Sequence, residues 1–218
     1  ARRADFPKSL AEADLILRFN EANPDTMVQN LETMKRIWPD LKLGVNWYFW
    51  TKQPWCVNFP EFFPAVDGSQ KVVAAAKRLG ILLAPYVDPR LWDEDLASFA
   101  YAERDVCRNF QGEISDEVYY PKHRLAVMCP TSDEWKRASL KMAIDAIGTN
   151  TINGCGFTGI YYDQVACSAM ISCWTPGHNH PKGGGHWWVD GYRQAFAKIH
   201  EYCSARGHQA RRIQPRQS

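Results

Sequence analysis

A repeating order of short apolar run, loop and helical pattern constrains the fold of this 218-residue chain most strongly. Apolar runs at residues 15–19, 41–50, 81–87 and 156–165 alternate with segments whose apolar side chains recur at helical spacing. Strands that alternate with helices indicate βαβ units and a parallel sheet. A short run at residues 125–128 fits the same order. The sequence therefore predicts an α/β fold.

Helix signals occupy the segments between these runs. Asn23 and Pro24 are a capping side chain and a first-turn proline, and Pro39 ends the helix that they start. A second helix is expected at residues 69–79, with Gly80 as its C-terminal stop. The remaining helices are expected from the capping residues at 131–134 to about 147, and at 188–205.

The number of repeats decides between architectures. We count four or five strand–helix units, whereas a closed eight-fold barrel typically needs ~250 residues. The predicted fold class is therefore a (β/α)8, TIM-barrel type, with about the N-terminal half of the barrel in residues 1–208. An open doubly wound sheet is the alternative, but neither GxGxxG nor GxxxxGK[ST] occurs. Residues 209–218 form an Arg/Gln-rich tail where the next barrel strand is due, so we expect a truncation or frameshift there.

The amino-acid composition indicates which class of ligand the chain can bind. Aromatic residues make up 13% of the chain, and many lie in expected loops such as residues 51–67, which suits stacking on the flat faces of sugar rings. The net charge of +2 gives no indication of nucleic-acid binding. No apolar run approaches the ~20 residues of a membrane span. No signal peptide is visible and the chain starts with Ala1, so the compartment stays open, secretion and the periplasm included. The oligomeric state is equally open.

Asp163 is the strongest catalytic candidate. It follows the aromatic pair Tyr161–Tyr162 in the run at residues 156–165, and parallel α/β folds keep their active sites at the carboxyl ends of strands. Glycoside cleavage uses two carboxyl groups, ~5–5.5 Å apart for retention and ~6.5–9.5 Å for inversion. The alternative is a carboxylate that caps the next helix or pairs with an arginine such as Arg90.

A second strand end, at residues 81–87, is also followed by polar and aromatic side chains. Charged groups make strong, directional hydrogen bonds to hydroxyls, whereas an internal Arg–Asp pair that holds the loop is the alternative. The side chains expected to bind substrate hydroxyls are Asp88, Arg90, Asp93, Gln164, His178 and His180. Those expected to stack on sugar faces are Trp47, Tyr48, Trp50, Tyr86 and Trp92.

A glycine-rich loop raises the question of a metal. His178, His180 and His186, with Asp163 or Cys173, are acceptable zinc ligands. Their spacing matches no strong metal motif such as HExxH, and the seven cysteines form no CxxC pair. We expect sugar contacts or loop-locking hydrogen bonds from these histidines, and we predict no metal and no cofactor. A metal-dependent hydrolase built on this loop is the alternative.

Four segments, in this order, carry a family resemblance: Tyr-Val-Asp-Pro-Arg-Leu-Trp-Asp at 86–93, Val-Met-Cys-Pro at 127–130, Gly-Ile-Tyr-Tyr-Asp-Gln at 159–164, and His-Asn-His-Pro-Lys-Gly-Gly-Gly at 178–185. Over about residues 14–207 the chain resembles a poorly characterised, mostly microbial family of glycoside-hydrolase-like barrels. That family is distantly similar to endo-α-N-acetylgalactosaminidases and α-galactosidases. The resemblance implies a (β/α)8 catalytic barrel that acts on carbohydrate, with Asp163 as the nucleophile on the fourth strand.

Two departures from the family pattern affect the expected function. Relatives more often carry Asn-Gly where this chain has Asp88-Pro89, and the family's acid/base carboxylate is expected on a strand beyond Gly207. No residue here inherits that role, so we expect an O-glycosyl hydrolase site that is active only in a full barrel, on an oligosaccharide or glycoconjugate. The alternative from another class is a non-catalytic carbohydrate-binding or degenerate barrel.

Overall fold

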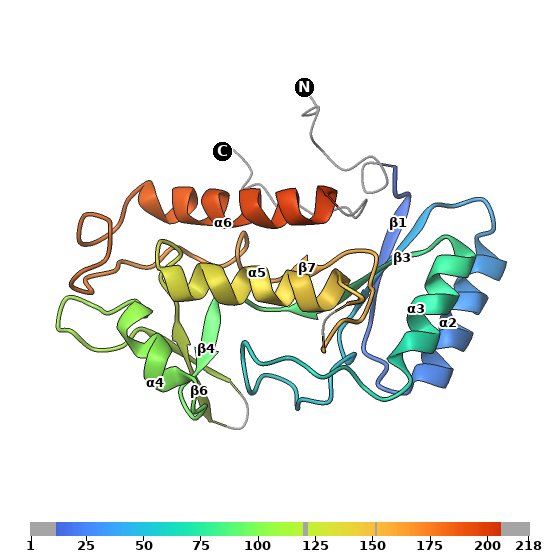
Figure 1. Ribbon diagram of the computed structural model, residues 1–218, viewed down its shortest axis with the longest axis horizontal. Helices are drawn as coiled ribbons and strands as arrows, with labels where there is room; N and C mark the ends of the chain where they lie inside the picture. The colour runs from blue at the N-terminus through green and yellow to red at the C-terminus, as the bar shows by residue number, and fades with distance from the viewer. Residues whose placement is uncertain (1–11, 120–121, 151, 206–218) are drawn as a thin grey trace.

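The computed structural model describes residues 12–119, 122–150 and 152–205. A four-stranded parallel sheet and a three-stranded antiparallel sheet form its framework (Figure 1). The described elements, in chain order, are β1 (Leu15–Phe19), α2 (Pro24–Ile37), β2 (Leu43–Trp47), α3 (Ser69–Leu79), β3 (Leu82–Val87), β4 (Leu91–Asp93), α4 (Phe99–Ala102), a 3₁₀ turn (Glu103–Asp105), β5 (Asp116–Tyr119), β6 (His123–Val127), α5 (Asp133–Ile147), β7 (Tyr161–Tyr162) and α6 (Trp187–Ser204).

The parallel sheet has the strand order β1-β2-β3-β7. Leu15 lies opposite Leu43, Gly44 lies opposite Leu82, and Tyr86 lies opposite Tyr161, all in parallel register. Each described strand is therefore added beside the previous one, without the reversal of order that marks a doubly wound sheet. The predicted α/β fold with a parallel sheet is confirmed.

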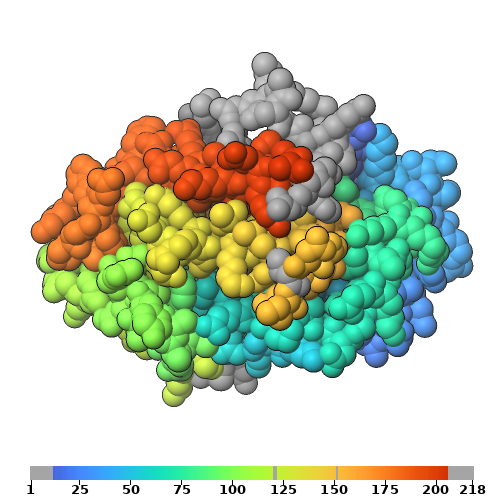
Figure 2. Space-filling model, in the orientation of Figure 1, coloured from blue at the N-terminus to red at the C-terminus, as the bar shows by residue number. Residues whose placement is uncertain are grey.

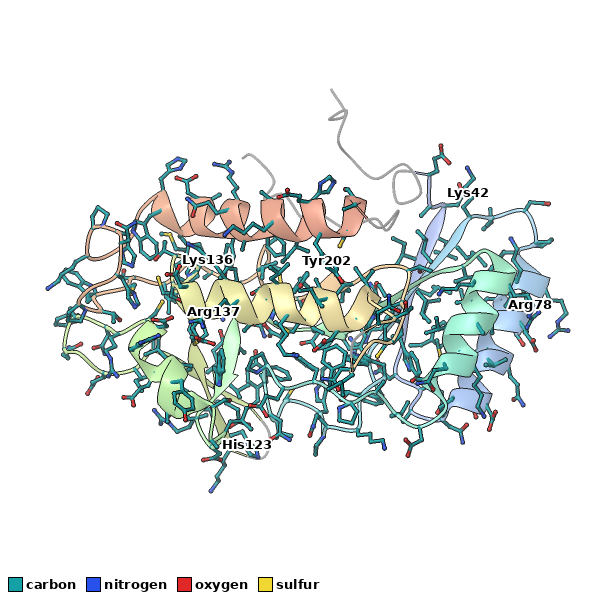
Figure 3. The ribbon with its side chains drawn as sticks, in the orientation of Figure 1. Lys42, Arg78, His123, Lys136, Arg137 and Tyr202 are labelled. Carbon is teal, nitrogen blue, oxygen red and sulfur yellow. The ribbon has the colours of Figure 1, made fainter. Side chains whose placement is uncertain are left out.

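The helices α2 and α3 form where their capping signals predict them. The side chain of Asn23 accepts hydrogen bonds from the backbone N–H groups of Asp25 and Thr26, at 2.8 and 3.2 Å. The last turn of α3 ends at Gly80, whose φ of 66° is left-handed and suits glycine. The two helices pack side by side, and their exposed faces are joined by an ion pair between Arg78 and Glu32 at 2.7 Å (Figure 3).

Two expected strands differ in the structure. The run at residues 125–128 belongs to β6, which pairs antiparallel with β4 and β5 rather than joining the parallel sheet. Pairing with β5 is local along the chain, because Tyr119 lies opposite His123 in a hairpin. The run at 156–165 contains only the two-residue strand β7. Before it, the backbone N–H of Leu83 donates to the Thr158 hydroxyl at 2.7 Å instead of to a backbone carbonyl, so the regular pairing does not extend further.

The C-terminal part of the described chain covers the sheets with two helices. The helices α5 and α6 lie side by side along the long axis of the molecule (Figures 1 and 2). Gly191 lets α6 approach the segment that leads into α5, because a Cβ atom there would come within 2.5 Å of the Pro130 carbonyl oxygen. In the described part of the chain, no helix combines the length and apolar content that a membrane crossing needs.

Candidate active site

The carboxyl ends of the parallel strands meet at one edge of the sheet, which we call the strand-end site. The strands β1, β2, β3 and β7 end at Phe19, Trp47, Val87 and Tyr162. Tyr48, Asp88 and Asp163 follow directly after three of these ends. The backbone N–H of Asp163 donates to the Val87 carbonyl at 2.8 Å, which fixes Asp163 beside the end of β3. The sequence expectation that Asp88 and Asp163 share one edge matches this placement.

Asp163 is half-buried and has a defined neighbour. The hydroxyl of Tyr161 donates to Asp163 Oδ1 at 2.9 Å, and the Cys167 thiol lies 3.9 Å from the same oxygen. Side chains two residues apart on a strand point to the same face, so Tyr161 follows from the sequence once Asp163 is selected. Sequence reasoning nevertheless omitted Tyr161 from the site. One carboxylate oxygen is thus oriented by a phenol while the group keeps access to solvent.

Asp88 is the opposite case, because its carboxyl group is completely buried. Its Oδ1 accepts the backbone N–H of Arg90 at 2.9 Å, and its Oδ2 has no hydrogen-bond partner among the described residues. Burial raises the pKa of Asp88 to about 8, and the charge of Asp163 adds to that shift, against the Arg90 backbone hydrogen bond. Asp88 therefore holds a proton at neutral pH, as buried carboxyl groups beside a like charge do.

Arg90 and Gln164 direct their polar atoms at each other and at neighbouring loops. The Arg90 guanidinium, 3% exposed, pairs with Glu117 and donates to Gln164 Oε1 at 3.2 Å and to the Ala169 carbonyl at 3.4 Å. Gln164 in turn donates to the Tyr119 hydroxyl at 2.7 Å. These contacts fasten the segment after β7 to the antiparallel sheet. Both residues were predicted to bind substrate, and in this structure they position the loop around Asp163.

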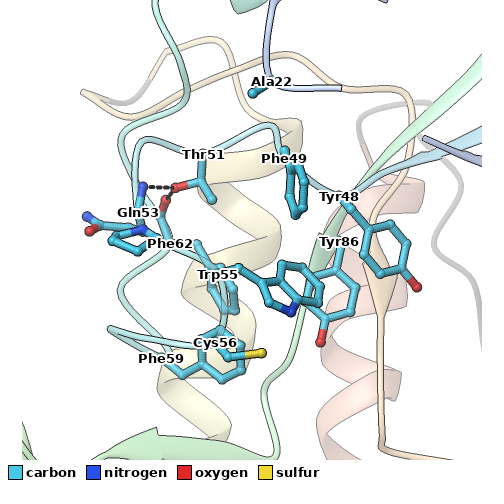
Figure 4. A pocket seen from close by; sticks show the side chains of 11 residues that line it. Ala22, Tyr48, Phe49, Thr51, Gln53, Trp55, Cys56, Phe59, Phe62 and Tyr86 are labelled. Atoms are coloured by element: carbon cyan, nitrogen blue, oxygen red, sulfur yellow. Dashed lines mark hydrogen bonds between the residues drawn. The ribbon is translucent and has the colours of Figure 1, made fainter. Parts of the chain in front are cut away.

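An aromatic pocket opens beside β2 and β3 (Figure 4). It has a volume of about 260 Å³ and is lined mainly by ring faces. The rings of Tyr48 and Tyr86 stack at 4.5 Å between centroids, and Trp55 lies 5.5 Å from Tyr48 and 5.0 Å from Tyr86. Trp55 is 42% exposed and was not among the predicted stacking residues, although it lies in the aromatic loop at 51–67. The pocket thus has an accessible indole above two packed phenols.

Tyr161 connects this pocket to Asp163. Its ring centroid lies 6.1 Å from that of Tyr48 and 5.9 Å from that of Tyr86, while its hydroxyl contacts the carboxylate. Burial, together with the charge of Asp163, raises the pKa of Tyr161 far above its usual value, and burial does the same for Tyr86. Both phenols therefore keep their protons and remain hydrogen-bond donors.

Two predicted stacking residues lie in the core instead. Trp47 and Trp50 are fully buried. The indole N–H of Trp47 donates to the Glu21 carbonyl at 2.6 Å, and that of Trp50 donates to the Tyr86 carbonyl at 2.7 Å. Both rings make edge contacts with Phe157. Neither offers a free face to a ligand here, because both rings are packed in the core.

Trp92 and Asp93 lie on β4, in the antiparallel sheet. Asp93 is 1% exposed and accepts the backbone N–H groups of Asn58 at 2.7 Å and Asp95 at 3.0 Å. The indole N–H of Trp92 donates to the Ser98 hydroxyl at 3.1 Å. Both side chains were predicted to contact substrate, yet their contacts hold the aromatic loop and α4 against β4.

His178 and His180 contact cysteines. His178 Nδ1 lies 3.3 Å from Cys173 Sγ, and His180 Nε2 lies 3.4 Å from Cys129 Sγ. His186, by contrast, is exposed at the start of α6 and belongs to no group of clustered ligands among the described residues. The histidine loop therefore forms a cluster of its own rather than part of the strand-end site. Cys129 was not predicted to take part in any site.

Comparison with known proteins identifies a family and two relatives that this chain matches. Residues 1–210 match the family described as "Domain of unknown function (DUF6259)". A protein of Bacteroides thetaiotaomicron named "Putative glycoside hydrolase" is 30% identical over 195 residues, 87% of this chain and 28% of that protein. One from Monosiga brevicollis, "Putative glycoside hydrolase 22789", is 28% identical and covers 79% and 16% of the two chains. The chain thus spans well under half the length of both relatives.

Solved structures with a similar fold include two glycosidases. An α-N-acetylgalactosaminidase from Bifidobacterium bifidum superposes with a TM-score of 0.67 at 16% identity, over 87% of this chain and 28% of that one. An α-galactosidase from Thermus thermophilus gives a TM-score of 0.56 at 14% identity, over 87% and 38%. At these identities the likeness establishes the fold alone.

The chain therefore has an α/β fold that it shares with glycosidases, and its strand ends bring a carboxylate beside aromatic rings. It belongs to the DUF6259 family, a glycoside-hydrolase-like family distantly similar to α-N-acetylgalactosaminidases and α-galactosidases. The family resemblance drawn from the sequence motifs is confirmed.

Proposed function

We propose that this domain binds an oligosaccharide or glycoconjugate at the strand-end site and hydrolyses its O-glycosidic bond through Asp163. The observation that carries the proposal is the continuity from pocket to carboxylate: Tyr161 packs against Tyr48 and hydrogen-bonds to Asp163. A sugar ring has apolar faces that stack on aromatic rings and hydroxyls that need polar partners. Such a surface, ending in a carboxylate, suits a ligand of this kind.

Asp163 would act as nucleophile or as stabiliser of the positively charged transition state. It is half-buried and its Oδ1 is oriented by Tyr161, which suits a carboxylate that must reach an anomeric carbon. Asp88 cannot reach a ligand in this conformation, because its carboxyl group is fully buried. We propose that Asp88 supports the site as a neutral acid. We further propose that the described strands belong to a (β/α)8 barrel whose acid/base carboxylate stands on another strand.

A second candidate function is carbohydrate binding without catalysis. It is favoured by the scarcity of accessible carboxylates: of Asp88 and Asp163, the two at this edge, only Asp163 reaches solvent. Glycosidases need two carboxyl groups that flank the bond. A metal-dependent hydrolase built on His178, His180 and His186 is not favoured, because His186 is not among the clustered metal-ligating side chains of the described residues.

Titration of the full chain with N-acetylgalactosamine and galactose, followed by calorimetry, tests the sugar site. Trp55→Ala should weaken binding about 10-fold or more, because the exposed indole supplies the stacking face. Trp174→Ala is the matched control, since Trp174 is 40% exposed but lies outside the pocket. Equal affinities for the two variants would remove the pocket from the proposal. Hydrolysis of aryl α- and β-glycosides by the wild-type chain then separates catalysis from binding alone.

A further inference from the structure

Four metal-ligating side chains converge at the end of the molecule opposite α2 and α3. Cys129 follows β6, and Cys173, His178 and His180 come from the loop before α6. One donor atom from each lies within 4.8 Å of the other three. In Figure 1 this loop, in orange, lies at the left end beside the green segment that contains α4. We call these four residues the Cys/His cluster.

We propose that the Cys/His cluster binds one Zn²⁺ ion in a closed structural site. Two thiolates and two imidazoles are a ligand set that zinc takes in tetrahedral structural sites. The inference is independent of the sugar site, and it revises the sequence expectation that the chain holds no metal.

Two sulfur–nitrogen distances within the Cys/His cluster are close to those of a zinc tetrahedron. Zinc–sulfur bonds of about 2.3 Å and zinc–nitrogen bonds of about 2.0–2.1 Å give sulfur–nitrogen edges of about 3.6 Å. The Cys173–His178 and Cys129–His180 pairs lie at 3.3 and 3.4 Å. Small outward movements of the side chains would bring both pairs to the bonded geometry. The remaining pairs of donor atoms lie within 4.8 Å of one another, so all four can approach a single ion.

The second nitrogen of each imidazole already has the partner that a zinc ligand needs. His178 Nε2 lies 3.0 Å from the Arg104 carbonyl oxygen, and His180 Nδ1 lies 2.8 Å from the Pro181 carbonyl oxygen. A carbonyl oxygen only accepts, so each of these nitrogens carries the proton and leaves the other to the metal. Metal-bound histidines almost always show this arrangement. The His180 ring is also stacked on Trp187, 3.6 Å between centroids and 9° between planes.

The burial and chemistry of the sulfur atoms suit a structural Zn²⁺ ion. Cys129 and Cys173 are fully buried, as is Cys107, whose thiol lies near both. Soft sulfur and nitrogen donors select zinc over the oxygen-seeking calcium and magnesium. Four protein ligands leave no open coordination position, so the ion would stabilise structure and would not activate water.

The proposed ion would join two parts of the chain that have little regular structure. The loop is already closed by two backbone hydrogen bonds between Cys173 and Gly183, at 3.0 and 2.8 Å. It is attached to the segment before β5 where Trp174 N–H donates to the Arg108 carbonyl at 2.8 Å and the Thr175 hydroxyl donates to the Val106 carbonyl at 2.6 Å. The zinc would add Cys129, at the entry to α5, to the same junction.

The test uses the untagged full chain, purified without chelators from medium that contains zinc, with metal measured by mass spectrometry on the folded fraction. We expect about one zinc per chain. His178→Ala and Cys173→Ser should each lower the zinc content at least about 10-fold. The matched controls are His186→Ala, an exposed histidine of the same loop, and Cys203→Ala, a buried cysteine on α6. Both should keep the metal.

A stability measurement covers the case in which a ligand variant fails to fold. Removal of zinc from the wild-type chain by a chelator should lower Tm by at least about 8 °C, and added Zn²⁺ should restore it. Absence of zinc from the folded wild-type chain would overturn the proposal, as would a disulfide between Cys107 and Cys129 or Cys173. The proposal also fails if His186→Ala loses the metal as fully as His178→Ala, because the ion would then sit elsewhere.

Discussion

The strand-end site and the Cys/His cluster differ in how their polar atoms are used. At the strand ends, Asp163 keeps access to solvent, and Trp55 exposes 42% of its surface beside a pocket. In the cluster, both histidines direct one ring nitrogen to a backbone carbonyl and turn the other to a buried sulfur. The sequence grouped the histidines with the sugar-binding residues, and the structure assigns them to a different part of the molecule.

This contrast separates groups that can bind a ligand from groups that hold the fold. A side chain whose donors and acceptors are satisfied internally cannot bind a ligand without breaking those contacts, and an unsatisfied buried group costs about 1–3 kcal/mol. Gln164 and Asp93 resemble the cluster in this respect, because their polar atoms bind other parts of the chain, although one follows β7 and the other ends β4. Proximity to a strand end is therefore a weaker criterion than a free polar atom.

The largest expected effect is on catalysis at Asp163. If the chain hydrolyses an aryl glycoside, Asp163→Asn should lower kcat/KM by at least about 1,000-fold, the scale seen when a nucleophile is removed. Thermal stability should change little, because the side chain is only partly buried. His186→Ala should leave the rate unchanged. If Asp163→Asn retains hydrolysis, another group carries out the chemistry. The strand-end site would then no longer differ from the Cys/His cluster in having a reactive, accessible carboxylate.

Arg90 should behave as a residue that holds structure. Arg90→Ala removes a buried guanidinium from Glu117 and Gln164, and we expect a loss of about 3 kcal/mol in the free energy of unfolding, measured by urea denaturation. Arg78→Ala, which breaks an exposed pair with Glu32, should change it by less than about 1 kcal/mol. Similar small losses in both variants would show that Arg90 is free to serve a ligand.

Asp88 gives a pH-dependent prediction. Its pKa is about 8 in the folded chain and about 3.9 in an unfolded one, so the native state binds the extra proton between these values. Stability from this group is complete below about pH 4 and is lost as pH rises towards 8. Between pH 5 and 7 the wild type should lose about 2.5 kcal/mol more than Asp88→Asn in urea denaturation. Parallel pH profiles for the two proteins would mean that Asp88 ionises freely.

Tyr161 should give the smallest of these effects. Tyr161→Phe keeps the ring that packs near Tyr48 and deletes the hydroxyl that donates to Asp163. A hydrogen bond to a charged group contributes about 1.5–3 kcal/mol, so kcat/KM should fall about 10-fold or more while sugar affinity changes little. In the Asp163→Asn background the same substitution should have almost no effect, because the two residues act as a unit. Additive losses would show that Tyr161 acts independently.

The sequence was sufficient where the causes are local. Caps and helical spacing located α2, α3, α5 and α6, and Ser69–Leu79 matches its predicted range. Asp163 was selected because chain order and strand ends are readable from the sequence. Trp47 and Trp50 could not be placed, since a ring at or just after the end of a strand can face the pocket or the core according to the packing of the neighbouring elements. Burial of both rings was decided by the packing around Phe157.

What the sequence by itself determined is the class of protein: the α/β repeat, the ordered motifs and the carboxylate after Tyr161–Tyr162 identify a glycoside-hydrolase-like domain. Only the tertiary structure decided which side chains share a site. It brought Cys129 to a loop far along the chain and separated His180 from Asp163. Periodicity records the neighbours that a residue has along its own element, whereas a site is made of contacts between elements, which exist only once the chain has packed.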